Sequence, residues 1–334
     1  MNNSILILGA NGQDGRLLCD YFDSKNIHYD IVVRNKYRYN SSNIRNIFIG
    51  DLNEYNFVEE IFRKNIYDKV FNFANETFVR DNNCIFYSTE KTKIFFNISR
   101  VIEESELNFW LCQPLSSEIF GVPLEIPQNS ATKIDPINNY GLAKTIELHG
   151  SKILRSKGYR VFNPIFFNHE SSYRDVRFFS AKAIQHFISY ANNTLKQEIF
   201  KFHNAKSVRD WGYAKEFMEL IIIASDKKIN GSSVIGTGHQ MSVLDFLKHL
   251  FIVLGIEVNI NICSSNNFIK IVDVKTNEII AQEMGVNVID EKRKFMADVN
   301  EIKSLGIDQP KIKGAELIKL LIDDTKKISS NNSC

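Results

Sequence analysis

The sequence has few of the residues that stabilise secreted or membrane-embedded proteins. It contains 5 cysteines in 334 residues, and none of them forms a CxxC motif. An odd number of widely spaced cysteines argues against a disulfide framework and is typical of reduced thiols in a cytoplasmic protein. No apolar run approaches the roughly 20 residues that a transmembrane helix needs. We therefore expect a soluble, cytoplasmic protein without a membrane partner, and no motif predicts a metal site. The cysteines are Cys19, Cys84, Cys112, Cys263 and Cys334.

An excess of charge of one sign is also lacking. The 41 Lys and Arg residues are nearly balanced by 39 Asp and Glu residues, which leaves a formal net charge of +2. Such a chain has no global field that would attract nucleic acid or an anionic membrane surface. An anionic ligand must therefore be bound by a local arrangement of residues. The composition, with 44% hydrophobic and 24% charged residues, is that of an ordinary globular protein.

Short apolar runs alternate with amphipathic helical stretches over the first half of the chain. This alternation requires right-handed crossovers and predicts an α/β fold with a doubly wound parallel sheet of the Rossmann type. The expected strands cover residues 5–8, 29–33, 47–49, 69–73 and 109–112, and the clearest helices cover 17–22, 57–64 and 94–104.

The alternation of strands and helices changes after about residue 168, where helical patterns become longer and buried strands fewer. Helices are expected at 179–190, 217–225, 243–254 and 315–322, and a strand near 233–236 is expected to return to the main sheet. We therefore predict a nucleotide-binding domain over 1–167, with a return segment of about 205–238. A smaller, mainly helical substrate domain is expected over 168–204 and 239–330.

A glycine-rich run lies between the first strand and the first helix. Gly9 permits a tight turn, Gly12 lets the backbone approach a pyrophosphate, and Gly15 allows the helix to pack closely on the strand. The helix N-terminus then favours the phosphates. The run therefore predicts a dinucleotide site at Gly9, Asn11, Gly12, Gln13, Asp14 and Gly15; the alternative is an ordinary glycine turn.

The residue after the second strand bears on the choice of cofactor. An acidic residue there is typical of NAD enzymes, whereas Arg accepts the 2′-phosphate of NADP. Here Arg34 follows the strand, with Lys36 and Arg38 close behind, so NADP is favoured, although a surface Arg in a basic loop is common. Asp51 and Leu52 follow the third strand, where adenine is usually bordered. Asp51 could equally be a helix N-cap.

Tyr140 and Lys144 are four residues apart on a predicted helix and hence lie on one face. An ammonium beside a phenol favours the phenolate and lowers its pKa from about 10. Such a Tyr can remove a hydroxyl proton while hydride leaves the same carbon. Ser116 comes after the fifth strand, at the sheet edge where this fold binds ligands. The alternative for Tyr140 is a surface Tyr on an amphipathic helix.

Glu118 follows Ser116 by two residues. Simple hydride transfer needs only Ser, Tyr and Lys, so this carboxylate suggests additional proton chemistry. It could instead be the partner of a salt bridge.

Several segments together resemble the GDP-mannose 4,6-dehydratase family of extended short-chain dehydrogenases/reductases. They are GANGQDGRL at 9–17, LSSEIFG at 115–121, NNYGLAK at 138–144, FFNHESSYR at 166–174, RDWGYAKEF at 209–217 and TGHQMSV at 237–243. They occur in the order of that family and span nearly the whole chain. The resemblance implies C4 oxidation by NADP⁺ with Tyr140 as base, removal of the C5 proton by Glu118, loss of water from C6, and return of the hydride to C6.

The resemblance also implies roles for further residues. Lys144 would serve Tyr140 and the ribose, and Ser116 would orient the 4-oxygen. Arg209 has an alternative role in an ion pair with Asp210 or another carboxylate, and for His169 we favour a buried hydrogen-bonding role over a chemical one. The remaining positions expected at the cofactor are Phe73, Ala74, His169 and Arg174, and those expected at the nucleotide sugar, besides Ser116, Glu118 and Tyr140, are Asn168, Lys182, Asn204 and Arg209.

Departures from the family gather on the substrate side. His203, Val208 and Val288 stand where the family has Gly, Lys and Arg, and Arg293 could compensate for the last. Asn75 and Glu76 replace small and amide residues. We therefore expect the dinucleotide chemistry to be retained, while the base or sugar differs from GDP-mannose.

Two other functions compete with the dehydratase. A 4-epimerase, 4-oxidase or 4-keto-reductase would use Tyr140 without the C5 and C6 steps. A catalytically silent dinucleotide-binding protein would explain the substrate-side departures, but it has no chemical reason to keep Ser116, Glu118, Tyr140 and Lys144. The family also implies a homodimer or homotetramer, with the loops at 34–38 and 172–177 as candidate contacts.

Overall fold

The computed structural model describes residues 4–37, 39–75, 85–194, 198–263 and 268–331. It divides the chain into two compact units. Unit 1 comprises residues 1–166, 214–235 and 298–309, and unit 2 comprises 167–213, 236–297 and 310–334. Each unit is therefore assembled from three separate segments of the chain.

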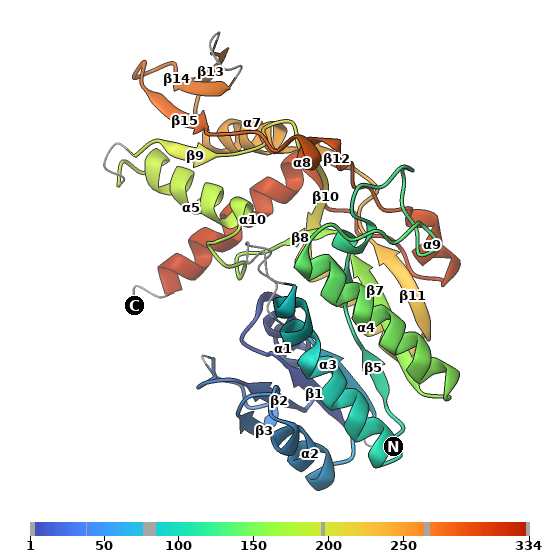
Figure 1. The fold of residues 1–334 in the computed structure, drawn as a ribbon. Helices are drawn as coiled ribbons and strands as arrows, with labels where there is room; N and C mark the ends of the chain where they lie inside the picture. Colours follow the sequence, from blue (N-terminus) through green and yellow to red (C-terminus); the bar gives the residue numbers. More distant parts are fainter. Residues whose placement is uncertain (1–3, 38, 76–84, 195–197, 264–267, 332–334) are drawn as a thin grey trace. The chain divides into compact units, whose positions relative to one another are not determined.

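Unit 1 is built on an 8-stranded sheet (Figure 1). Seven of its strands follow the order β11-β7-β5-β4-β1-β2-β3, and the eighth, the short β6, pairs with β7. All of its pairings are parallel. The chain order reverses direction between β1 and β4, so the carboxyl ends of these strands form the crevice in which such a sheet binds ligands. The strands are β1 (Ile5–Leu8), β2 (Tyr29–Val33), β3 (Ile44–Ile49), β4 (Lys69–Asn72), β5 (Trp110–Cys112), β6 (Leu115–Ser116), β7 (Arg160–Phe166) and β11 (Gly231–Ile235).

Helices cover both faces of this sheet. Leu6 and Leu8 of β1 pack with α2, α3 and the end of α4 in one hydrophobic core. Successive strand residues point to opposite faces, so Ile7 faces the other layer, where α1 packs beside α6. The helices of unit 1 are α1 (Gln13–Ser24), α2 (Tyr55–Lys64), α3 (Phe86–Glu104), α4 (Asn139–Ser156), α6 (Ala214–Asp226) and α9 (Val299–Ser304), with the 3-10 helix η1 (Ser117–Phe120).

The doubly wound parallel sheet expected from the sequence is confirmed. Each of the five predicted strands is present, and the segment near 233–236 forms β11, which pairs with β7 as a returning strand. β1, β2, β4 and β5 are buried along their whole length, which makes their sequences largely apolar. β3 is an edge strand and mostly exposed, and only its apolar end, residues 47–49, was predicted.

Unit 2 has its own hydrophobic core, formed by α5, α7 and α10 together with strand residues. Sequence analysis predicted these helices but not the two small sheets beside them. One sheet has the order β12-β10-β8 and the other β13-β14-β15-β9. The elements are β8 (Asn168–Glu170), α5 (Phe179–Ala191), β9 (Phe200–Phe202), β10 (Val208–Tyr213), β12 (Gln240–Ser242), α7 (Val243–Leu254), β13 (Val258–Ile262), β14 (Ile269–Asp273), β15 (Ile279–Glu283), α8 (Val288–Lys292) and α10 (Gly314–Asn331).

Within the described ranges, no helix combines the length and apolarity needed to cross a bilayer.

Candidate active site

The glycine-rich run forms a tight turn from β1 into α1. Gly9 has φ +83°, and a Cβ there would lie 2.7 Å from the backbone of Phe73 and Ala74 at the end of β4. A Cβ on Gly15 would lie 2.4 Å from the Gly9 carbonyl oxygen, so both positions require glycine for close approach of backbone. Gly12 is the N-cap of α1, and no side chain of the described residues caps this helix end. The first turn of α1 therefore has backbone N–H groups that suit a pyrophosphate.

The loop after β2 folds back toward this turn. Asn11 donates from Nδ2 to the carbonyl oxygen of Lys36 at 3.3 Å. Arg16, on the first turn of α1, donates to the hydroxyl of Tyr37 at 3.1 Å. Arg34 itself is exposed directly beyond β2, whereas Arg38 lies outside the described residues. The loop therefore holds an exposed guanidinium at the strand end where the 2′ position of a bound dinucleotide is expected.

Asp51 does not cap α2, contrary to one of the two interpretations of the sequence. The helix begins at Tyr55 with Glu54 as its N-cap. The Asp51 carboxylate instead accepts hydrogen bonds from the backbone and side chain of Asn53, both at 2.9 Å. The next residue, Leu52, is buried, and its carbonyl oxygen accepts from Asn97 of α3 at 2.9 Å.

Tyr140 and Lys144 lie on the first two turns of α4, as predicted. The ammonium of Lys144 is 5.9 Å from the centre of the Tyr140 ring. It donates to the carbonyl oxygen of Pro114 at 3.0 Å, which fixes the side chain to the segment just before Ser116. Lys91 of α3 brings a second ammonium to 6.0 Å from the same ring. Two cations thus lie near one phenol, an arrangement that favours its ionised form.

The Ser116–Glu118 segment packs against the start of α4. The Ser116 hydroxyl accepts from the Glu118 backbone N–H at 3.3 Å and so caps η1. The Glu118 carboxylate accepts from Nδ2 of Asn138 at 2.6 Å. Asn138 is the N-cap of α4, where its Oδ1 accepts from the Gly141 N–H at 2.7 Å. One amide side chain therefore joins the carboxylate to the helix turn that carries Tyr140.

Sequence analysis missed Glu147, which is fully buried and forms an ion pair with Lys144 at 2.7 Å. Burial, the largest influence, lowers the pKa of the Lys144 ammonium, but the charges of Glu147 and Tyr140 outweigh it, so that the pKa lies above its ordinary value. The spacing of Lys144 and Glu147 was the only signal in the sequence, because residues three apart share a helix face.

The ion pair of Arg209 is formed with Asp290 rather than with Asp210, so the ion-pair alternative is confirmed with another carboxylate. Asp210 is buried, and its carboxylate accepts from the backbone N–H groups of Thr237, Gly238 and Ala297. Burial, the dominant influence, raises the pKa of this carboxyl despite these hydrogen bonds. Arg209 instead faces Asp290 at 3.8 Å.

Asp290 is the centre of a polar cluster in unit 2. Besides Arg209, it forms an ion pair with Arg293 at 3.2 Å and accepts from Nδ2 of Asn204 at 3.1 Å. Both guanidinium groups lie over the ring of Phe295. Arg293 is therefore present beside Arg209, whereas Val288 is exposed on α8.

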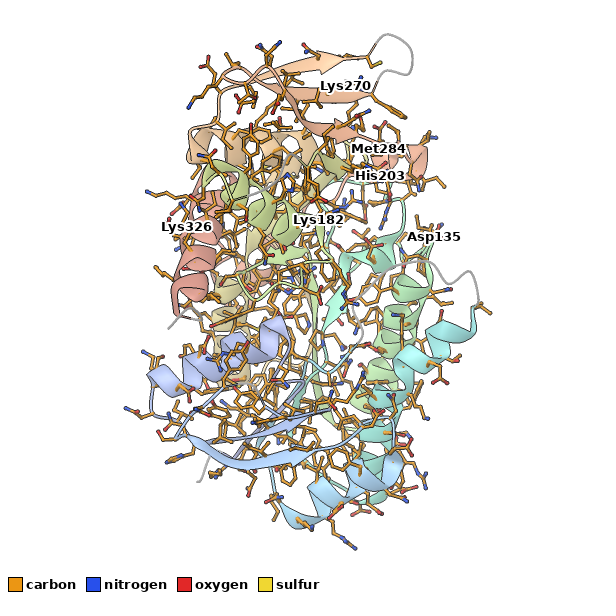
Figure 2. All side chains as sticks on the ribbon, turned by 90° about the vertical axis from the view of Figure 1, so that its left-hand side faces the viewer. Asp135, Lys182, His203, Lys270, Met284 and Lys326 are labelled. Carbon is orange, nitrogen blue, oxygen red and sulfur yellow. The ribbon has the colours of Figure 1, made fainter. Side chains whose placement is uncertain are left out.

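The remaining predicted residues of unit 2 have local contacts. His169 is buried, and its Nδ1 contacts the Phe167 carbonyl oxygen at 2.9 Å. Arg174 pairs with Glu170 at 3.4 Å, and Asn168 begins β8. Lys182 lies on α5 with its ammonium 5.5 Å from the ring of Phe200, and Figure 2 labels it together with His203, which follows β9. The roles assigned to these residues stay predictions.

A glycine turn on a parallel sheet, a Tyr and a Lys on one helix, and a Ser at the adjacent strand end together define an extended short-chain dehydrogenase/reductase. The family described as GDP-mannose 4,6 dehydratase matches residues 6–321. The chain belongs to this family, as the motifs of the sequence suggested.

Several curated relatives are GDP-mannose 4,6 dehydratases, and they match at similar levels of identity. The protein of Drosophila melanogaster is 26% identical over 270 residues, which cover 74% of this chain and 67% of the relative. The human protein is 26% identical over 76% of this chain and 73% of its own length. The protein of Yersinia enterocolitica is 27% identical, with 76% and 72% covered.

Solved structures share the fold at much lower identity. The UDP-glucose 4-epimerase of Thermotoga maritima has a TM-score of 0.80 at 17% identity, covering 98% of this chain and 99% of its own. The dTDP-glucose 4,6-dehydratase of Bacillus anthracis, in complex with NAD, has a TM-score of 0.78 at 13% identity, covering 98% and 97%.

Proposed function

We propose that this protein catalyses the 4,6-dehydration of a nucleotide-activated sugar, GDP-mannose or a related GDP-sugar, with NADP⁺ as a recycled cofactor. The observation that carries the proposal is the connection of Glu118 to the first turn of α4 through Asn138, with 2.6 Å between Asn138 Nδ2 and the Glu118 carboxylate. This connection brings an acid–base carboxylate beside the Tyr140 and Lys144 pair. A simple dehydrogenase needs the pair but not the carboxylate.

The first step assigned to the chain is removal of the proton from the sugar 4-hydroxyl. The Tyr140 phenolate takes this proton, and Lys144 and Lys91 stabilise the phenolate by their charge. The Ser116 hydroxyl orients the 4-oxygen. When bound, NADP⁺ accepts the hydride from C4 and returns it later in the same turnover.

The second step is assigned to Glu118. The 4-keto group acidifies the proton on C5, and the Glu118 carboxylate removes it. The C6–O bond then breaks, and the proton held by Glu118 leaves with the 6-hydroxyl as water. With the hydride returned to C6, C5 takes up a proton and Tyr140 releases the one it took from the 4-hydroxyl. The 4-keto-6-deoxy sugar is then complete, one water has been lost, and the phenolate, the carboxylate and the cofactor are restored.

The residues of the β1–α1 turn suit a dinucleotide. Gly9 and Gly15 leave no room for side chains, and the N-terminus of α1 is free of a capping side chain among the described residues. We propose that Gly9 to Gly15 hold the pyrophosphate, that Arg34 binds the 2′-phosphate of NADP, and that Asp51, Leu52, Phe73 and Ala74 border the adenosine half.

For the nucleotide sugar we propose roles for polar residues of unit 2, in addition to Ser116, Glu118 and Tyr140. Arg209 and Arg293, which share Asp290, provide two guanidinium groups for a diphosphate. Asn168, Lys182 and Asn204 would contact the nucleotide, and His169 and Arg174 the cofactor. We further propose a homodimer or homotetramer located in the cytoplasm, in keeping with the free, buried thiols of Cys19 and Cys112.

The test separates dehydration from other C4 chemistry. The protein is incubated with NADP⁺ and GDP-mannose, and the products are analysed by mass spectrometry. Loss of one water supports the proposal, whereas an oxidised or epimerised product of unchanged oxygen content replaces it with a sibling activity. Glu118→Gln should abolish water loss while hydride transfer from C4 persists in a single turnover. Normal dehydration by this variant would remove the role of Glu118, and a cofactor absorbance that no nucleotide sugar changes would favour a silent paralogue.

A further inference from the structure

Glu147 lies beneath the catalytic pair on the buried side of α4. Its carboxylate accepts from three side chains: Lys144 Nζ at 2.7 Å, Gln113 Nε2 at 2.9 Å and Asn75 Nδ2 at 3.0 Å. Gln113 in turn accepts from Asn72 at 2.7 Å. The donors come from the ends of β4 and β5, so the carboxylate joins two strand ends of the sheet to the helix.

An ordinary surface ion pair does not explain this arrangement. Lys and Glu three residues apart are common on exposed helix faces, where the pair contributes little. Here the side chains of Lys144 and Glu147 are 5% and 0% exposed. Burial of two charges is costly unless each is paired and hydrogen-bonded, and apolar residues at both 144 and 147 would avoid that cost. The presence of a glutamate at position 147 is therefore better explained by the effect of its carboxylate on the charge and position of the Lys144 amine.

We propose that Glu147 is a positioning residue for the reaction: its carboxylate keeps the buried amine of Lys144 protonated and fixes it against the Pro114 carbonyl, one helical turn from Tyr140. The inference rests on the proposed function, because it assumes that Tyr140 is the base. It also explains Asn75, a departure from the family noted in the sequence, since Asn75 supplies one of the hydrogen bonds that a buried carboxylate needs. Glu76, the neighbouring departure, lies outside the described residues.

Other charged groups reach this part of α4 from two elements. Lys91 of α3 lies 6.0 Å from the Tyr140 ring, and Glu118 of η1 is held by Asn138 at the helix N-terminus. Lys144 is paired with Glu147 rather than with Glu118 in the ion pairs of the described residues. Removing the charge at 147 therefore leaves the Lys144 ammonium buried without its nearest counter-charge.

The expected consequence is a change in the pH at which Lys144 loses its proton. Burial lowers the pKa of this amine and Glu147 raises it, so in Glu147→Gln the lowering by burial prevails. Fully buried lysines can titrate about 3–5 pH units below their ordinary value. The kcat/KM profile of the wild type should stay flat toward high pH, because the pKa of Lys144 lies above its ordinary value. In this variant the profile should fall above roughly pH 5.5–7.5.

The experiment combines kinetics with a direct measurement that needs no substrate. Protein labelled with [ε-¹³C]lysine is titrated by NMR, and the Lys144 signal is assigned by its loss in Lys144→Met. We expect the signal to report a charged amine throughout the accessible range in the wild type and to titrate near neutral pH in Glu147→Gln. In parallel, kcat/KM is measured against pH with NADP⁺ and GDP-mannose.

Two further variants make the result specific. Glu147→Asp keeps the charge, so the high-pH side of the profile should be retained while kcat falls about 3- to 10-fold, because the shorter side chain reaches Lys144 less well. Asp30→Asn is the matched control: Asp30 is 2% exposed in the same unit and accepts from Tyr67 at 2.9 Å, but it lies near the amino end of β2. It should lose stability without a change in the profile.

An amine that stays charged in Glu147→Gln, or a profile of wild-type shape, overturns the proposal. If Glu147→Gln does not fold, Glu147→Asp decides: wild-type kcat together with an unmoved Lys144 titration overturns the proposal. If the wild type does not act on nucleotide sugars, the proposed reaction fails. The NMR titration still reports whether Glu147 controls the charge of Lys144.

Discussion

Replacement of Asn138 by Asp should separate the two proton transfers of the proposed reaction. Asn138 has two functions: Oδ1 caps α4 by accepting from the Gly141 N–H, and Nδ2 donates to Glu118 at 2.6 Å. Asp is as good an N-cap as Asn, so the helix should be unaffected. The donor toward Glu118, however, becomes a second carboxylate oxygen.

The size of the effect follows from the separation of the two carboxylates. Two unit charges about 4 Å apart repel by about 1 kcal/mol in water and about 4 kcal/mol at an effective dielectric constant of 20. Glu118 is half-buried and lies between these limits. This repulsion favours protonation of one of the two groups, and a penalty of about 1.4–2.8 kcal/mol on the ionised base corresponds to a 10- to 100-fold loss of rate.

The assay follows the two half-reactions separately. Hydride transfer from C4 is measured in a single turnover from the absorbance of the reduced nicotinamide, and water loss is measured by mass spectrometry. In Asn138→Asp, water loss should be slowed about 10- to 100-fold and should recover as the pH rises. Hydride transfer should stay within about twofold of the wild-type rate. Equal slowing of both steps, or water loss at the wild-type rate, would refute the assignment of Glu118. Asn138→Ala is the control: it should cost about 1 kcal/mol of stability through the lost cap without this pH dependence.

Three further predictions concern the cofactor turn, the choice of cofactor and unit 2. Gly9→Ala forces a Cβ to within 2.7 Å of the backbone at Phe73 and Ala74, at φ +83°; urea denaturation should show a loss of about 2–5 kcal/mol. Arg34→Ala should raise the Kd for NADP⁺ about 10- to 100-fold through the loss of a charge-assisted contact and leave the Kd for NAD⁺ nearly unchanged, as measured by fluorescence titration or calorimetry. Asp210→Asn places an NH₂ group against backbone donors that now meet a carboxylate oxygen, such as the Gly238 N–H at 2.9 Å; thermal and urea unfolding should show a loss of about 2–4 kcal/mol.

The parts of the fold and site that could be predicted depend on contiguous sequence. The strand Ile5–Leu8 and the glycines after it carry their signal within a dozen residues, because a buried parallel strand is apolar throughout and a dinucleotide turn needs glycine at fixed positions. Tyr140 and Lys144 were also recognisable, because their helical spacing follows a buried strand and the Ser116–Glu118 segment in the order that this fold requires.

The parts that could not be predicted depend on distant segments. Glu147 has the spacing of an ordinary surface pair, and its burial depends on Asn75 and Gln113, which the sheet brings to it from other strand ends. The strand Val258–Ile262 was missed because it is largely exposed, so its sequence lacks the apolar continuity of a core strand. Asp51 precedes a helix in the sequence like an N-cap, but the helix begins later, at Tyr55.

The division of unit 1 among three segments of the chain has a consequence for its biosynthesis. Glu301, on the last of these segments, accepts from the backbone N–H groups of Ser130 at 3.1 Å and Val234 at 2.8 Å. During translation the strands β1 to β7 leave the ribosome first. Glu301 emerges only after most of unit 2 has been synthesised. The sheet of unit 1 is therefore synthesised before the hydrogen bonds from Glu301 can form. A polypeptide whose synthesis stops before residue 298 would have an incomplete unit 1.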